Sequence, residues 1–222
     1  MYINWQLREL NLKIVYYGPA MSGKTTNLEQ IHARVPANRR SDLVSLKTHE
    51  DRTLFFDFLQ LELGKISGLT PKLQLYTVPG QSYYEASRKL VLRGADGVVF
   101  VADADPARVS DNLAAWQDMK RHLKEMNISL ADIPVVVQVN KQDLPGALSP
   151  EIYRSLLSLG GQVAIGAVAI RQIGVFETLK AITQRVVGRL HQRSKSPEVG
   201  HGTNPVPPPS PPSSQTTTTI RE

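Results

Sequence analysis

The sequence contains no cysteine, and this absence excludes disulfide bonds, thiolate metal sites and cysteine nucleophiles. Uncharged apolar runs of the roughly 20 residues that span a bilayer are also missing. The first nine residues mix polar and charged side chains, unlike a signal peptide. Met1 is not followed by a glycine that could be myristoylated, and the C-terminus has no cysteine that could be prenylated. We therefore expect a cytoplasmic protein with no direct lipid anchor.

The basic residues are scattered along the chain and form no long positively charged segment. The formal net charge is +6, and the densest basic cluster consists of Lys120, Arg121, His122 and Lys124. Interleaved aromatic residues, which accompany many nucleic-acid sites, are absent from this cluster. We therefore expect no nucleic-acid partner, and a basic surface that favours an anionic nucleotide or lipid.

Composition changes sharply after Arg193. Residues 194–222 consist largely of Pro, Ser and Thr, and their aliphatic side chains are Val199, Val206 and Ile220. Such a segment cannot bury enough apolar surface to offset its ordering entropy. We predict one globular domain, residues 1–193, and a disordered tail, residues 194–222. Residues 205–208 fit the P-x-x-P ligands of SH3-like domains, although a solvated spacer is the favoured interpretation.

Apolar strand-like runs alternate with helical patterns along the domain. Strands are predicted at residues 10–17, 53–63, 69–78, 97–102, 134–139 and 163–168, and helices at 24–34, 83–93, 106–125, from Pro150, and at 175–190. Glycines between the second and third strands predict an antiparallel hairpin. We therefore expect an α/β, three-layer fold, with a mostly parallel six- to seven-stranded sheet, helices on both faces and one antiparallel hairpin strand.

A phosphate-binding motif follows the first predicted strand. Residues 18–25 read G-P-A-M-S-G-K-T, which fits G-x-x-x-x-G-K-[ST], and a helix follows at once. The glycines let backbone N–H groups approach phosphate, and the helix N-terminus favours negative charge. In such a P-loop NTPase Lys24 reaches the β- and γ-phosphates and Thr25 ligands Mg²⁺. The predicted nucleotide-binding residues here are Gly18, Pro19, Ala20, Met21, Ser22, Gly23, Lys24, Thr25 and Thr26.

A second motif indicates which base is bound. The strand predicted at residues 134–139 runs into Asn140-Lys141-Gln142-Asp143, which fits N-K-x-D. Guanine presents two adjacent N–H donors, and a carboxylate such as Asp143 can accept from both, whereas adenine has no matching pair. Asn140 would hold the loop and contact the base, and the stem of Lys141 would lie against the base. We therefore predict a guanine nucleotide, GTP or GDP.

The third motif, residues 77–81, follows the second hairpin strand. In Ras-like GTPases this position reads D-x-x-G-Q, where the Gly N–H contacts the γ-phosphate and the Gln orients the attacking water. Gly80 and Gln81 match, but Thr77 replaces the aspartate and so removes a carboxylate from the surroundings of Mg²⁺. A hydroxyl can still hold a metal-bound water. We predict Thr77 and Gly80 in the nucleotide site and Gln81 as a catalytic residue, together with Lys24.

Thr53 and Arg52 lie between these motifs, where Ras-like proteins carry a switch threonine. Thr53 would sense the γ-phosphate and be the second protein ligand of Mg²⁺, beside Thr25. An arginine that reaches the transferring phosphoryl group stabilises its charge and is worth about 10³ to 10⁵ in rate. We therefore predict Arg52 as a catalytic residue.

Four segments together resemble the bacterial MglA family of Ras-like small GTPases: residues 16–19, 51–57, 76–81 and 174–180. The resemblance covers about residues 1–190. It implies a GTP/GDP switch with Mg²⁺ that sets cell polarity and motility through effector proteins, and a threonine at position 77 is a feature of the family.

The same resemblance implies how the switch is regulated. Arg52 would act in cis, the activator would be an MglB-like homodimer of the roadblock family, and the GTPase would be monomeric alone. It would be recruited from the cytoplasm to a cell pole or a membrane-associated complex. In the family the hairpin strand shifts register between nucleotide states, and the alternation of residues 53–63 would tolerate a two-residue shift.

The last nucleotide loop matches the family poorly. Ras-like proteins read about S-A-K there, and the best alignment places Ala169 at its centre, without the lysine. The N–H of Ala169 could contact guanine O6. Three functions are weighed, in order of preference: a GTP-hydrolysing switch, a nucleotide-loaded scaffold without useful turnover, and a P-loop ATPase or kinase. Thr77 and the Ala169 loop motivate the second function, and the N-K-x-D motif argues against the third.

Overall fold

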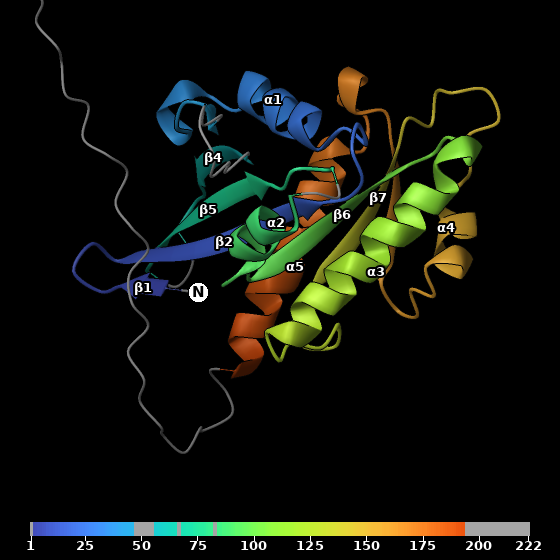
Figure 1. Ribbon diagram of the computed structural model, residues 1–222. Helices are drawn as coiled ribbons and strands as arrows, with labels where there is room; N and C mark the ends of the chain where they lie inside the picture. Colours follow the sequence, from blue (N-terminus) through green and yellow to red (C-terminus); the bar gives the residue numbers. More distant parts are fainter. Residues whose placement is uncertain (1, 47–55, 66–67, 82–83, 194–222) are drawn as a thin grey trace, which may run out of the picture.

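A computed structural model describes residues 2–46, 56–65, 68–81 and 84–193. It shows one sheet with helices on both of its faces (Figure 1), and the predicted three-layer α/β fold is confirmed. The predicted tail, residues 194–222, lies outside the described residues, so the domain boundary stays a prediction.

The described residues form an eight-stranded sheet in the order β3-β4-β5-β2-β6-β7-β8, with β1 paired to β2. Parallel pairs join β2 to β5 and β6, and β7 to β6 and β8. The predicted antiparallel hairpin is β4 with β5. The strands are β1 (Tyr2–Asn4), β2 (Glu9–Tyr17), β3 (Val44–Leu46), β4 (Phe56–Glu62), β5 (Thr70–Thr77), β6 (Gly97–Asp103), β7 (Val135–Asn140) and β8 (Val163–Ala167).

Two of these strands, β1 and β3, were not predicted and raise the count above the expected six or seven. Each has three residues and pairs antiparallel with a longer strand, β1 with β2 and β3 with β4. Three residues are too few to show an alternating pattern. Such strands form only because a longer strand offers them a hydrogen-bonding edge.

The helices divide between the two faces of the sheet. One hydrophobic cluster joins α1 and α5 to the sheet, and the other joins α2, α3 and α4 to its opposite face. The helices are α1 (Lys24–Arg34), α2 (Glu85–Leu92), α3 (Val109–Glu125), α4 (Pro150–Leu156) and α5 (Val175–Arg193), with short 3₁₀ turns η1 (Ala37–Arg39), η3 (Pro106–Arg108) and η4 (Ala169–Arg171).

Strand burial explains the periodicity of the sequence. In β2, Ile14 and Tyr16 face the α1 and α5 side, whereas Val15 and Tyr17 face the α2 and α3 side. Every residue of β6 and β7 is buried, because parallel strands in the middle of a sheet are covered on both faces. These central strands therefore read as continuous apolar runs.

Helix boundaries differ from the predictions by a few residues. The long helix expected from Pro106 starts as the 3₁₀ turn η3, and α3 follows from Val109. The Asp105 side chain accepts a hydrogen bond from the N–H of Ala107 at 2.9 Å, which ends the preceding loop and starts this turn. The helix expected at residues 83–93 is α2, which begins at Glu85.

The parallel arrangement brings the sequence motifs together. The carboxyl ends of parallel strands lie at one edge of a sheet. In this protein β2 leads into residues 18–23, β5 ends at Thr77, β7 ends at Asn140, and β8 leads to Ala169. The phosphate loop, the motif after β5, the N-K-x-D motif and the Ala169 loop therefore lie at that edge.

Candidate nucleotide-binding site

Two glycines shape the loop between β2 and α1. Gly18 has a φ of +148° and Gly23 a φ of +98°, in the region that favours glycine. A Cβ atom on Gly18 would lie 2.2 Å from the carbonyl oxygen of Val101, and one on Gly23 would lie 2.2 Å from Nδ2 of Asn140. The loop backbone therefore packs directly on β6 and on the end of β7, where only glycine fits.

The N-terminus of α1 follows this loop. Its N-cap is Gly23, and within the described part of the chain no side chain caps the helix. The first N–H groups of a helix have no helical partner, and together with the helix dipole they attract an anion. The loop and the helix end therefore supply the backbone donors that a phosphate group needs. Thr26 lies in the first turn and is half-buried, and Thr25 before it is exposed.

The Lys24 side chain lies along the loop. Its Nζ donates hydrogen bonds to the carbonyl oxygens of Gly18 at 3.1 Å and Pro19 at 2.6 Å. Desolvation by burial, reinforced by the nearby charge of Arg88, lowers the pKa of Lys24 to about 7, and the carboxylate of Asp57 opposes this shift. A phosphate beside Nζ would favour the ammonium form, so an anion stabilises this buried amine more than the loop carbonyls do.

Asn140 links three loops. Its Nδ2 donates to the carbonyl oxygen of Ser22 at 2.8 Å, and its Oδ1 accepts from the N–H of Ala169 at 2.8 Å. Asn140 is buried, so losing either bond would leave a polar group without a partner at a cost of about 1–3 kcal/mol. The phosphate loop, the N-K-x-D loop and the last loop therefore form one unit. The Ala169 N–H that was expected to reach guanine O6 donates to Asn140 in this structure.

The other two residues of the N-K-x-D motif have separate partners. Lys141 has a φ of +69°, and its Nζ lies 2.6 Å from Oδ2 of the buried Asp103. Asp143 is partly exposed, with Oδ2 4.0 Å from a terminal nitrogen of Arg171. A basic residue, Arg171, therefore follows two positions after Ala169, one position beyond the place where the S-A-K pattern has its lysine. The neighbour of the Asp143 carboxylate in this structure is thus the guanidinium group of Arg171.

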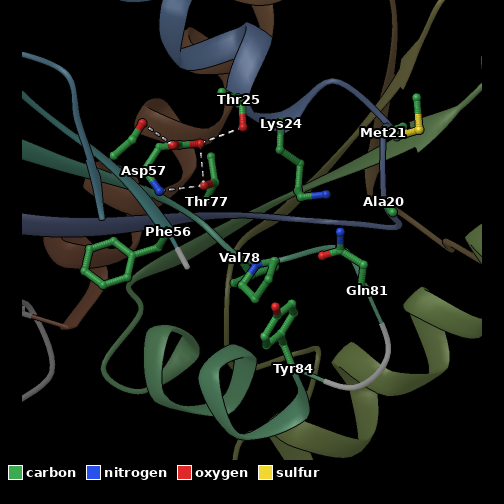
Figure 2. Close-up of a pocket in the computed structure, with 13 residues that line it drawn as sticks. Ala20, Met21, Lys24, Thr25, Phe56, Asp57, Thr77, Val78, Gln81 and Tyr84 are labelled. Carbon is green, nitrogen blue, oxygen red and sulfur yellow. Dashed lines mark hydrogen bonds between the residues drawn. The ribbon is translucent and has the colours of Figure 1, made fainter. Parts of the chain in front are cut away.

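The residues after β5 pack on the phosphate loop. A Cβ atom on Gly80 would lie 2.3 Å from the Cα of Ala20, so the two backbones are in direct contact. Gln81 follows and is exposed. A cavity of about 290 Å³ opens between the two segments, lined among others by Lys24, Thr25 and Gln81. Figure 2 shows the Lys24 and Gln81 side chains at this cavity.

A carboxylate that the sequence analysis did not assign to the site occupies one wall of the cavity. Oδ2 of Asp57 accepts hydrogen bonds from the hydroxyls of Thr25 at 2.6 Å and Thr77 at 2.9 Å (Figure 2). The Asp57 N–H donates to Oγ1 of Thr77 at 2.9 Å, and Ser45 donates to Oδ1 at 2.7 Å. Thr77 is buried and its hydroxyl proton is already used.

Two predicted residues cannot be placed. Arg52 and Thr53 lie outside the described residues, so their roles stay predictions. Within residues 2–46, 56–65, 68–81 and 84–193 there is no group of three His, Cys, Asp or Glu side chains that could hold a metal ion. Over the same residues no helix is long and apolar enough to cross a membrane.

Comparison with known proteins identifies the family. The sequence model of the ADP-ribosylation factor (Arf) family matches residues 2–193. The chain belongs to this family of small GTPases. It is 48% identical over 189 residues to the mutual gliding-motility protein MglA of Myxococcus xanthus, which covers 85% of this chain and 97% of that protein. The predicted membership of the MglA group is thus confirmed.

More distant relatives extend the comparison. The chain is 31% identical over 153 residues to ADP-ribosylation factor-like protein 2 of Drosophila melanogaster, covering 68% of this chain and 72% of the fly protein. It is 28% identical over 144 residues to the Ras-related protein RABG3a of Arabidopsis thaliana, covering 64% and 63%. This GTPase binds guanine nucleotides, and the ATPase or kinase alternative has no support among these relatives.

Sequence reasoning assigned no role to two side chains that contact predicted site residues: Asp57, which contacts Thr25 and Thr77, and Arg171, which lies beside Asp143. Asp57 faces Thr77 because Phe58 pairs with Tyr76 in the β4–β5 ladder. The sequence predicted the hairpin but not which residues of its two strands are opposite each other. Without that register, a carboxylate between Phe56 and Phe58 could equally have faced solvent. Arg171 follows the Ala169 loop in sequence. A search for any basic side chain near that loop, rather than for a lysine at one position, would have found it.

Proposed function

We propose that this GTPase is a Mg²⁺-dependent switch that binds GTP, hydrolyses it to GDP and presents different surfaces in the two states. The observation that carries the proposal is the pair of hydrogen bonds from Asn140 to Ser22 and Ala169, which join the predicted base loops to the predicted phosphate loop. Because the three loops form one unit, one nucleotide can contact all of them.

Base selection is assigned to Asp143. Its carboxylate is accessible and would accept from the two donors on the guanine edge. A terminal nitrogen of Arg171 lies 4.0 Å from Oδ2 of Asp143, so this carboxylate has a positive charge beside it and is still accessible. Lys141 would lay its stem along the base while its amino group remains on Asp103.

The residues present fit a bound Mg²⁺. This cation takes hard oxygen ligands and is usually held by few protein groups and the substrate phosphates. The hydroxyl of Thr25 is exposed at the cavity next to the Asp57 carboxylate, and Thr53 is the second predicted ligand. When bound, Mg²⁺ neutralises charge on the β- and γ-phosphates.

Hydrolysis would rest on positioning and charge stabilisation. Lys24 would turn from the loop carbonyls to the phosphates, and the Gly80 N–H would bind the γ-phosphate. The Gln81 side chain, at the cavity, would orient the attacking water. Arg52 would stabilise the developing charge in cis.

The cellular role is proposed from the relative in Myxococcus xanthus, whose name describes a gliding-motility protein. We assign this GTPase to the control of cell polarity or motility through effector proteins. An MglB-like homodimer of the roadblock family would activate it. The GTPase would be cytoplasmic and monomeric alone, would be recruited to a cell pole or a membrane-associated complex, and would carry residues 194–222 as a spacer outside the GTPase domain.

Replacement of Gln81 by Leu tests the proposed chemistry. Gln81→Leu should keep GTP affinity while lowering the single-turnover hydrolysis rate by roughly 10²-fold, because the attacking water loses its orientation. The measurement is radiolabelled phosphate release from Mg²⁺-GTP, with ATP in a parallel reaction. Gln117→Leu, on the exposed face of α3, is the matched control. An unchanged rate in Gln81→Leu, or equal turnover of ATP and GTP by the wild type, would contradict the proposal.

A further inference from the structure

The Asp57 carboxylate stands where the third motif lacks one. Thr77 occupies the position at which Ras-like GTPases carry an aspartate, on β5. Asp57 lies directly opposite on β4, as the pairing of its neighbour Phe58 with Tyr76 requires. Its Oδ2 lies 2.9 Å from the Thr77 hydroxyl and 2.6 Å from that of Thr25. Strand β5 thus carries a threonine where Ras-like GTPases have an aspartate, and the adjacent strand β4 provides a carboxylate beside it.

Hydrogen-bond directions show what this carboxylate does to Thr25. A threonine hydroxyl has one proton and two lone pairs. The proton of Thr25 points to Oδ2 of Asp57, so its lone pairs are directed elsewhere and remain available to a cation. A hydroxyl that also binds a metal is strengthened as a ligand when its proton is held by an anionic acceptor.

Thr77 and Ser45 hold the carboxylate in place. Thr77 donates its proton to Oδ2 and accepts the Asp57 N–H, so its hydroxyl is tied to Asp57 twice. Ser45 of β3 donates to Oδ1 at 2.7 Å. Because both oxygens of Asp57 accept hydrogen bonds, the side chain has a defined orientation toward Thr25. The role expected for Thr77, holding a metal-bound water, is less consistent with this use of its hydroxyl than a role as the anchor of Asp57.

We infer that Asp57 is the positioning residue for Mg²⁺: it holds the Thr25 hydroxyl in the orientation that ligands the cation and supplies the negative charge missing at position 77. The inference rests on the proposed Mg²⁺-dependent nucleotide site. It assigns to Asp57 of β4 the negative charge that Ras-like GTPases place on β5, at the position of Thr77. Thr77 would act through Asp57, to which its hydroxyl is hydrogen-bonded, and would not be a ligand of the cation.

The test is the Mg²⁺ dependence of GDP release. The full chain is loaded with a fluorescent GDP analogue, and its dissociation rate is followed at a series of buffered free Mg²⁺ concentrations. Asp57→Asn keeps the size of the side chain and removes its charge. It should raise the Mg²⁺ concentration for half-maximal retention by about 10–100-fold, while release in excess EDTA stays at the wild-type rate. Glu62→Gln, at the exposed far end of β4, is the matched control and should shift nothing.

A charge relocation separates this role from a merely structural one. In a protein with Asp57→Thr and Thr77→Asp together, the carboxylate moves to β5, and most of the wild-type Mg²⁺ dependence should return. Melting temperatures of all variants identify those that fold. A folded double variant that behaves like Asp57→Asn would contradict the inference.

Two further results would overturn it. An unchanged Mg²⁺ requirement in folded Asp57→Asn would show that the carboxylate only joins strands, and a lowered requirement would show that it competes with the cation for Thr25. Both differ from failure of the proposed switch itself, in which GDP release from the wild type would not respond to Mg²⁺ at all.

Discussion

At the scale of single residues, Lys24 illustrates the conflict between stability and ligand binding. Its amino group is buried against the carbonyl oxygens of Gly18 and Pro19. Burial lowers its pKa from 10.5 to about 7. The unfolded chain therefore binds this proton more tightly than the folded polypeptide does, and below pH 7 folding carries the full desolvation penalty.

Replacement of Lys24 by Met should stabilise the nucleotide-free protein. At pH 6.5 both states of the wild type are charged at this position, so removing the amine should raise the free energy of unfolding by up to about 5 kcal/mol. Between pH 7 and 10 the folded wild type loses the Lys24 proton, so the stability difference between Lys24→Met and the wild type should become smaller. Urea denaturation at pH 6.5 and 9.5 measures it, with the exposed Lys180→Met as control. The same gain at both pH values would refute this account.

At the scale of elements, the contact between α5 and β6 depends on a glycine. A Cβ atom at Gly97 would lie 2.7 Å from Cγ2 of Val186 and 3.0 Å from Cδ1 of Ile182, both on α5. The first residue of β6 thus lets the helix approach the sheet closely. Gly188, on the exposed side of the same helix, has no atom within 4 Å of such a Cβ.

The two glycines should respond to alanine in opposite ways. Gly97→Ala should lower the free energy of unfolding by about 1–2 kcal/mol, because the added methyl group displaces side chains of α5. Gly188→Ala should raise it by up to about 1 kcal/mol, because alanine is the better helix former. Chemical denaturation of both variants provides the comparison. A shift of the same sign in both would show that α5 does not depend on close packing at Gly97.

At the scale of the whole molecule, the predicted boundary after Arg193 can be tested directly. Helix α5 contributes Val186 to the core, where this side chain is buried in the cluster that contains residues of β2 and β6. The tail from residue 194 has a composition that cannot form a core of its own. The domain and the tail should therefore be separable.

A chain ending at Arg193 should keep the hydrolysis rate of the full chain and its free energy of unfolding within roughly 0.5 kcal/mol. A chain ending at Thr183 removes Val186 from the core and should be less stable by roughly 2 kcal/mol or more. Calorimetry and single-turnover hydrolysis on the three chains test this. A loss of stability on removing residues 194–222 alone would show that the tail is part of the fold.

Much of this protein could be predicted from its sequence, because the features involved are local. The glycine-rich loop, the alternating hairpin and the continuous apolar runs of β6 and β7 each leave a pattern within a few residues. Chain order then places the motifs at one sheet edge, since parallel strands joined by helices all end there. The fold class, the guanine-nucleotide chemistry and the family follow from such patterns, whereas β1 and β3 are too short to leave one.

Only the tertiary structure decided which groups distant in sequence meet. Strand register turns Asp57 toward Thr77 and Thr25, and a register set by pairing over the whole ladder leaves no mark on a single residue. Close loop packing lets Asn140 bind both Ser22 and Ala169 and brings Arg171 to Asp143. Local patterns thus determined which chemistry this protein performs, and the packing of loops and strands decided which side chains support it, because those contacts join segments up to 118 residues apart.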